Sequence, residues 1–211
     1  MHFEVLLEGA SDVPTIKEIF LRRFGFTEGN GFRLHSHKGK GQLPDNPLAK
    51  PGLKHQGLLD QLPAKLRGYS NSLLPDSIVL VVIDLDNESK DVLINALNNM
   101  LQQLGVRLNV IFSFAIEETE SWFIADLNAV KNAYPKAKLS ELKKIPADAI
   151  VGAWEHLAKA INPKANLKTI SGKDKCEWAG KIAPHLNLDT PYSPSLKDLI
   201  EGMRLQIENK A

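Results

Sequence analysis

The sequence predicts an α/β protein in which a parallel sheet is flanked by helices. Six consecutive apolar residues at 78–83, most of them β-branched, fit a short strand buried on both faces, as in the middle of a parallel sheet. Three further apolar runs alternate with segments of helical periodicity, which is typical of β-α-β units. From about residue 135 the alternation stops, and helical segments follow one another between proline-containing loops. We therefore expect an α/β domain at 1–134 and a helical extension at 135–211 that packs on it.

The first β-α unit begins with an apolar run at 3–7. A tight turn follows, and Pro14 then fits the first turn of a helix, where its missing N–H costs little. Ser11 or Asp12 is expected to cap this helix, because both residue types accept hydrogen bonds from a helix N-terminus. The segment therefore predicts a strand, a turn and a helix, the first half of a βαβ unit.

Helical spacing of apolar residues predicts most of the other elements. The segment at 53–66 places leucines on one face, Pro63 is expected to end or kink it, and 68–76 is expected to be a linker. The segment at 90–104 is clearly amphipathic, and Gly105 fits its C-terminal stop. The remaining expected elements are strands at 32–36 and 109–116, a helix from about 122, and helices at 147–161, 173–185 and 195–209.

Composition excludes several classes of protein. The chain has 211 residues, of which 43% are hydrophobic and 24% charged, as is ordinary for a soluble globular protein. Its formal net charge is +1, so no overall basic field indicates nucleic-acid binding, although a local patch is compatible with it. Cys176 is the single cysteine, which excludes an intrachain disulfide and the usual zinc-finger clusters. No apolar run approaches the roughly 20 residues of a membrane helix, so we expect a cytoplasmic protein without a membrane partner.

Acidic residues follow three of the predicted strands at their carboxyl ends. Asp84 and Asp86 end the run that starts at residue 77, and their spacing would place both on one face if the strand continued. Glu8 follows the first strand, and a cluster at 117–120 follows the fourth. The carboxyl ends of parallel strands gather along one edge, where open α/β sheets bind ligands. Because converging carboxylates repel one another unless a proton or cation joins them, a hard divalent ion such as Mg²⁺ is the economical explanation.

A purely structural interpretation of the same acids stays open. Aspartate is common after strands as a solvated turn residue or a helix cap, and Asp84 and Asp86 taken alone fit this as well as an ion site. A helix also favours acidic residues in its first turn, which would explain one glutamate of the 117–120 cluster more easily than three. Three acidic sites at one edge are harder to attribute to chance than any one of them.

Basic residues form two local groups. The loop H-K-G-K-G at 37–41 combines glycines, which allow the backbone to approach an anion, with two lysines, but it lacks the Walker A spacing. A solvated surface loop is the simpler interpretation of that stretch. Five lysines make the C-terminal part locally basic, and a solvated face is the usual explanation of such a run. They are Lys164, Lys168, Lys173, Lys175 and Lys181.

Two of these motifs together resemble the Toprim domain, which topoisomerases, bacterial primases and nucleases of the overcoming-lysogenization-defect type share. The motifs are Glu8-Gly9-Ala10-Ser11-Asp12 after the first strand and Asp84-Leu85-Asp86 after a later hydrophobic strand. The stretch E-x-E-S-W-F-I-A-D at 118–126 and the H-K-G-K-G loop resemble a bacterial family of uncharacterised Toprim-like proteins. Many of those lie in mobile or antiviral-defence gene neighbourhoods. The resemblance covers roughly residues 1–130, and its motifs are short.

The resemblance implies a Toprim-like, Rossmann-like sheet and a Mg²⁺-dependent (or Mn²⁺-dependent) nuclease that acts on DNA or RNA. Glu8 would be the general acid/base, and Asp84 and Asp86 would bind the ion and complete the catalytic set. Glu118 and Glu120 are further ligand candidates. The candidates for phosphate contact are Lys38, Lys40 and Lys173, because lysine is a point-charge phosphate binder.

The resemblance also has limits and rivals. Topoisomerases carry a nucleophilic tyrosine on a separate domain, and no tyrosine here has a matching context. A defence role would bring a partner protein such as an ATPase. The main alternative is a non-catalytic Toprim-like module that binds nucleic acid or a partner, which the near-neutral charge favours. A phosphatase or phosphotransferase with an aspartate nucleophile ranks third.

Overall fold

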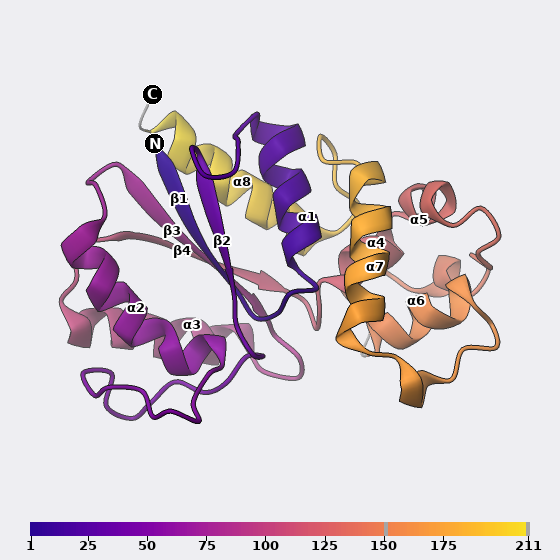
Figure 1. Ribbon diagram of the computed structural model, residues 1–211. Helices are drawn as coiled ribbons and strands as arrows, with labels where there is room; N and C mark the ends of the chain where they lie inside the picture. Colours follow the sequence, from indigo (N-terminus) through magenta and orange to yellow (C-terminus); the bar gives the residue numbers. More distant parts are fainter. Residues whose placement is uncertain (150–151, 210–211) are drawn as a thin grey trace.

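Four parallel strands form the sheet of the computed structural model, which describes residues 1–149 and 152–209 (Figure 1). The strands lie in the order β2-β1-β3-β4, and every neighbouring pair is parallel. They are β1 (His2–Leu7), β2 (Phe32–Ser36), β3 (Ser77–Asp84) and β4 (Asn109–Ala115). The central strand β3 is buried from its first residue to Ile83, as its run of β-branched residues predicts. The α/β class, the parallel sheet and the alternation of strands with helices are therefore confirmed.

Helices cover both faces of the sheet. Alternate side chains of β3 point to opposite faces, so Val79 and Val81 pack with one pair of helices and Ile78 and Leu80 with the other. The first pair is α2 (Leu58–Ser72) and α3 (Lys90–Leu104). The second is α1 (Val13–Glu18), which continues as a π-helical turn, and α8 (Pro194–Glu208), which lies against β4.

The other helices form a lobe beyond the carboxyl ends of the strands (Figure 1). We call residues 120–185 the helical lobe. It comprises α4 (Glu120–Ala125), α5 (Leu127–Ala133), α6 (Ala153–Ile161) and α7 (Gly172–Ile182). One hydrophobic core runs from Phe3 in β1 to Trp178 in α7, so the sheet and the lobe pack together. The predicted boundary at residue 134 stays a prediction, since α4 and α5 precede it within the lobe and α8 returns to the sheet.

The second helix differs from its prediction. α2 begins at Leu58 and ends at Ser72, so the first part of the predicted linker at 68–76 is helical. Its start is fixed by Asp60, whose carboxylate accepts the Gly57 N–H at 3.0 Å. Pro63 does not end the helix but lies buried inside it, which shows that leucine burial outweighs the missing backbone hydrogen bond. In contrast, α3 matches its prediction, and Gly105 ends it with φ 59.

Asp126 divides the helix predicted from residue 122 into α4 and α5. Its Oδ1 accepts the Ala129 N–H at 3.0 Å as the cap of α5, and its Oδ2 accepts the Asn187 N–H at 2.9 Å. The helix predicted at 147–161 begins only at Ala153; residues 147–149 are not helical, and 150–151 lie outside the described residues. Among the described residues, no helix has both the length and the apolar character needed to cross a bilayer.

Candidate functional site

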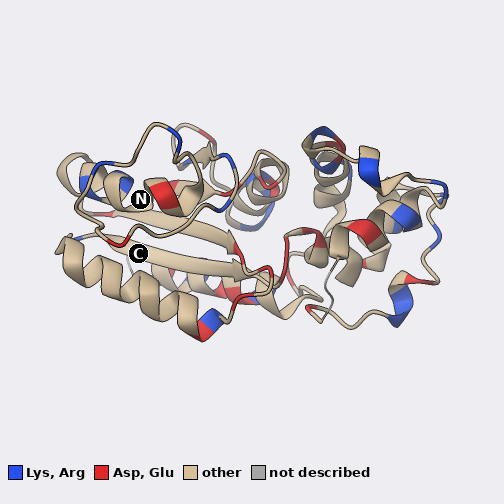
Figure 2. Cartoon of the chain, turned by 90° about the horizontal axis from the view of Figure 1, so that it is seen from below, with Lys and Arg blue, Asp and Glu red and all other residues tan. Residues whose placement is uncertain are grey.

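The candidate site lies where the strand order of the sheet reverses. From β1 the chain moves outward to β2, and from β3 it moves outward to β4 on the other side. The carboxyl ends of β1 and β3 are therefore neighbours at a topological switch point, the place where open α/β sheets bind ligands. Acidic residues gather there, between the strand ends and the helical lobe (Figure 2).

Glu8 and Asp84 meet at this point. Glu8 follows the last residue of β1 and Asp84 is the last residue of β3, and Glu8 Oε1 accepts the Asp84 backbone N–H at 2.9 Å. The Asp84 carboxylate itself receives no hydrogen bond and no ion pair from any described residue. The two acids predicted from distant parts of the sequence thus lie side by side. The Asp84 carboxylate has no direct donor, although the charge of Lys175 acts on it from a longer distance.

Asp12 is the next acid in this cluster. It occupies the N-cap position of α1, but its side chain makes no capping hydrogen bond to the helix, so the predicted cap is wrong. Its carboxylate instead accepts the Gly9 N–H and the Thr119 hydroxyl, each at 3.0 Å. Asp12 is buried, and these bonds tie the turn after β1 to the turn after β4.

Three further side chains belong to the cluster, two from the helical lobe and one from the turn that precedes it. Glu118 lies two residues before the start of α4, Glu120 begins it, and both form ion pairs with Lys175 of α7, at 2.5 and 3.6 Å from its Nζ. The Lys175 ammonium also lies 5.2 Å from the ring centroid of Trp154, a cation–π distance. Although burial alone would lower the Lys175 pKa, its acidic neighbours raise it above the ordinary value, so this lysine stays charged.

Burial and mutual repulsion raise the pKa values of Glu8, Asp12, Asp84, Glu118 and Glu120. Burial is the main cause for Asp84, whose pKa lies well above its ordinary value, and the neighbouring carboxylates of Asp12, Glu8, Glu120 and Glu118 raise it further. Burial likewise raises the pKa of Glu8 to about 8 and that of Glu118 to about 7, and it raises the pKa values of Asp12 and Glu120. The carboxylates of this cluster therefore outnumber the ammonium groups that act on them, those of Lys175 and Lys40.

Asp86 departs from the expected arrangement. The strand ends at Asp84, and Asp86 adopts φ 50 in the left-handed region, so the two aspartates do not share a face. The Asp86 carboxylate pairs with Lys40 at 3.1 Å, and Lys40 also contacts Glu88 at 2.7 Å and the Asp84 carbonyl at 2.7 Å. Asp86 nevertheless lies close enough to Glu8 to raise its pKa, so it belongs to the margin of the cluster.

Glu117 has a structural role, unlike its neighbours in the acidic stretch. It adopts φ 62, and its buried carboxylate accepts the backbone N–H groups of Gly152 and Ala153, the latter at 2.9 Å. These are the first N–H groups of α6, which a carboxylate satisfies well. Of the cluster at 117–120, only Glu118 and Glu120 therefore face the other acids.

The three lysines predicted for phosphate contact have different surroundings. Lys40 is committed to the loop after β3 by four oxygen contacts, whereas Lys38 and Lys173 are exposed. The prediction missed Lys175, which stands two residues after Lys173 and was assigned to a solvated face. Helical spacing could not place it in the site, because its position depends on how the lobe packs against the sheet.

A family model described as a domain of unknown function, DUF4276, matches residues 16–204. The chain belongs to the DUF4276 family. The match extends from within α1 to within α8 and includes Asp84, Glu118, Glu120 and Lys175. It covers three of the four strands and the helical lobe, whereas β1 and Glu8 precede it. Neither the curated proteins nor the solved structures gave a match.

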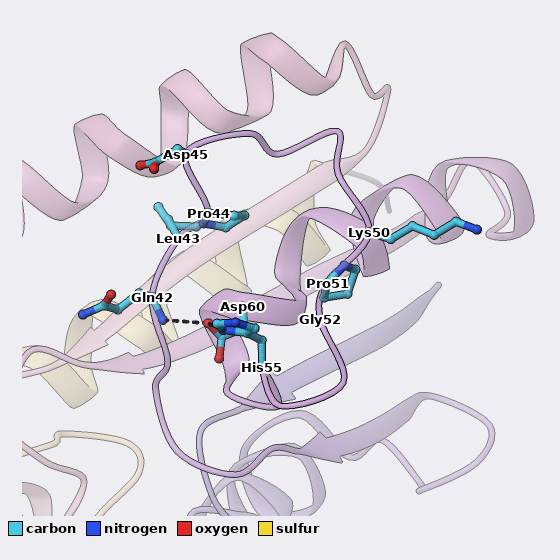
Figure 3. A pocket seen from close by; sticks show the side chains of 9 residues that line it. All are labelled: Gln42, Leu43, Pro44, Asp45, Lys50, Pro51, Gly52, His55 and Asp60. Carbon is cyan, nitrogen blue, oxygen red and sulfur yellow. Dashed lines mark hydrogen bonds and ion pairs between the residues drawn. The ribbon is translucent and has the colours of Figure 1, made fainter.

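This DUF4276 chain also has a hollow away from the acidic site (Figure 3). The loop after β2 folds back over the start of α2, and the Gln42 N–H donates to Asp60 at 3.2 Å. His55 lies 3.6 Å from the same carboxylate. The residues that line the hollow are Gln42, Leu43, Pro44, Asp45, Lys50, Pro51, Gly52, His55 and Asp60. Because Asp60 already receives these donors, its charge is accounted for by the fold.

The donor chemistry of the acidic cluster fits a hard divalent cation. Across 1–149 and 152–209, no three histidine, cysteine, aspartate or glutamate side chains form a ready-made set of metal ligands. The cluster of this DUF4276 chain nevertheless offers carboxylate oxygens, the ligands that Mg²⁺ prefers, and no described residue donates a hydrogen bond to the Asp84 carboxylate. Of the residues predicted as ligands, Glu8, Asp84, Glu118 and Glu120 belong to this cluster.

Proposed function

We propose that this protein is a Mg²⁺-dependent nuclease, with a Toprim-like α/β domain, that hydrolyses phosphodiester bonds of DNA or RNA. The observation that most supports this is the Asp84 carboxylate, whose pKa four other carboxylates raise and to which no described residue donates a hydrogen bond. Such a group requires a proton or a cation, and it lies at the switch point of the sheet, where ligands bind.

Each residue of the cluster has a distinct proposed role. A bound divalent ion would supply Lewis-acid stabilisation of the negative charge that develops on the phosphate. Asp84, Glu118 and Glu120 would hold it through carboxylate oxygens. Glu8 would hold and release a proton, since its pKa of about 8 in the ion-free protein lies in the range that suits a general acid/base.

Two lysines would support this reaction from opposite sides. Lys175 would keep Glu118 and Glu120 in place and add positive charge where the phosphate arrives. Lys40 would hold the loop after β3, because its ammonium contacts two carboxylates and two carbonyls of that loop. Lys40 acts through the loop, so it is a positioning residue.

The test is an Asp84→Asn variant in a cleavage assay. Wild-type protein with Mg²⁺ or Mn²⁺ should cleave supercoiled plasmid or single-stranded RNA, and EDTA should stop cleavage. Asp84→Asn should reduce the rate about 10³-fold, because it would weaken the hold on an ion whose stabilisation of the transition-state charge contributes several kcal/mol. Asp198→Asn on α8, at an exposed aspartate, is the matched control and should retain the wild-type rate. Unchanged cleavage by Asp84→Asn would refute the assignment.

The second candidate is a non-catalytic Toprim-like module that binds nucleic acid or a partner protein. It is favoured by the lack of a ready-made ligand set in the described residues and by the pairing of Asp86 with Lys40. Calorimetric titration with Mg²⁺ separates the two candidates, since a pure binding module need not take up the ion. A role in antiviral defence with an ATPase partner stays a prediction from the resemblance.

A further inference from the structure

The charges of this chain are divided between its two parts. The helical lobe, residues 120–185, contains 11 lysines and 7 acidic residues, a net charge of +4. The rest of the chain contains 15 basic and 18 acidic residues, a net charge of −3. Two of the lobe's acids, Glu120 and Asp126, are buried, so its surface is more basic than its composition. The overall net charge of +1 therefore conceals a basic lobe beside an acidic sheet edge.

Several lobe lysines are exposed around one hollow on α6. The hollow is lined by Lys138, Lys159, His156 and Pro163, and Lys164 follows directly in the sequence. Lys138, Lys159 and Lys164 are all exposed, and among the described residues none has an acidic partner for its ammonium. Glu141 also borders this hollow, but Lys144 pairs with it at 3.2 Å. Positive charge at the hollow is thus left without compensation by the fold.

The helical lobe is joined to the acidic site. Lys175 of α7 reaches Glu118 and Glu120, and the connection from α6 to α7 continues from the hollow through Lys164 and Lys168. Glu117 contacts the N-terminus of α6 and the hollow lies toward its C-terminus, so a polyanion that extends along this nine-residue helix, about 14 Å, would reach the acidic stretch.

We propose that the helical lobe binds the phosphate backbone of the nucleic acid, with Lys138, Lys159 and Lys164 as its main contacts. This rests on the proposed function for the identity of the polyanion. Exposed lysines are point charges that contact phosphates without reading bases, so binding is independent of sequence. The division of charge also explains how a nearly neutral protein binds a polyanion: the lysines are gathered in one part.

The test is binding without cleavage. Fluorescence anisotropy with a labelled DNA duplex or single-stranded RNA in EDTA measures affinity from low to physiological salt. The triple variant Lys138→Gln, Lys159→Gln and Lys164→Gln should weaken binding at least about tenfold at low salt. The slope of log K against log salt should also become shallower, by roughly 0.7–0.9 for each phosphate that the variant no longer neutralises.

A matched variant separates position from net charge. Arg33→Gln, Arg107→Gln and Lys197→Gln removes the same three charges from exposed sites outside the lobe. It should change affinity less than about twofold. Equally weakened binding in both triple variants would overturn the proposal, as would tighter binding of polyglutamate than of nucleic acid. Both nucleic acids failing to bind wild-type protein at low salt would overturn it too.

The outcomes also distinguish this inference from the proposed function. If binding depends on the lobe lysines but the protein cleaves no nucleic acid when Mg²⁺ is supplied, the binding role of the lobe is supported and the nuclease function is rejected. The wild-type protein and the lobe variant can also be compared for Mg²⁺-dependent cleavage at substrate concentrations below saturation. Equal rates would support the nuclease function and reject the binding role of the lobe.

Discussion

The acidic residues at the strand ends fall into two groups: a centre, Asp84 with Glu118 and Glu120, and a margin, Glu117 and Asp86. The two groups contain the same residue types but differ in the donors that surround them. At the margins, Glu117 receives two backbone N–H groups and Asp86 receives the Lys40 ammonium. At the centre, the Asp84 carboxylate has no donor among the described residues, and Glu118 shares one ammonium with Glu120. Where the chain supplies donors, an acid is explained by folding. Where it does not, a ligand is the better explanation.

From this comparison we expect the largest loss of folding stability when a margin residue, Glu117, is replaced. Glu117→Ala should lower the free energy of unfolding by about 3 kcal/mol, because hydrogen bonds to a charged group contribute about 1.5–3 kcal/mol each and two buried N–H groups would be left without an acceptor. Glu118→Gln should lower it less than Glu117→Ala does, because burial already disfavours the Glu118 charge, raising its pKa to about 7, and Lys175 keeps Glu120 as a partner. Urea unfolding measures both. Equal destabilisation by the two changes would remove the distinction between margin and centre.

The buried acids next to Asp84, above all Glu8, should instead make the free energy of unfolding depend on pH. The Glu8 pKa is raised from 4.5 to about 8 in the folded protein, chiefly by burial, so the folded state binds more protons than the unfolded state between these values. The contribution of Glu8 to folding stability is therefore fully present below about pH 4.5 and is lost as the pH rises through 8. At about 1.4 kcal/mol per pKa unit, and reduced for neighbouring acids that share protons, the loss is roughly 2 kcal/mol.

The measurement is urea unfolding in EDTA over pH 5–9. Glu8→Gln should flatten the decline and be more stable than wild type at pH 9. Glu28→Gln, at an exposed glutamate paired with Lys17, is the control and should preserve the wild-type decline. A wild-type stability that rises across this range would contradict the protonation of Glu8.

The sequence could predict the edge but not its inner arrangement. β-branched residues at 78–83 and the periodicity of the helices specify the sheet, and the parallel order brings Glu8 and Asp84 together. The two-residue spacing of Asp84 and Asp86 would place both on one face only if the backbone stayed extended. The left-handed φ of 50 at Asp86 ends the extended backbone, so the two side chains diverge from that arrangement. Glu117 and Glu118 are adjacent in sequence, and only the packing of α6 shows which of them is a cap.

Residues from the helical lobe were the hardest to predict. Lys175 stands in an ordinary amphipathic helix, and nothing local separates it from Lys173, which is exposed. Its role follows from the position of α7 over the strand ends, a long-range packing result. Pro63 shows the same limit for the fold, since its burial inside α2 depends on the leucines around it.

The smallest expected effect concerns Lys40, which links margin and centre. Its partners Asp86 and Glu88 are each 56% exposed, so Lys40→Met should cost only about 1 kcal/mol of stability, as exposed ion pairs do. The electrostatic effect reaches further, because the Lys40 charge lowers the Glu8 pKa against the effect of burial. Removing that charge should move the Glu8 pKa above 8, as carboxyl NMR titration in EDTA would show. Lys17→Met, at an exposed lysine paired with Glu28, should leave the Glu8 pKa in place. If Lys40→Met also leaves it unchanged, the margin does not communicate with the centre, and Asp86 has no place in the proposed site.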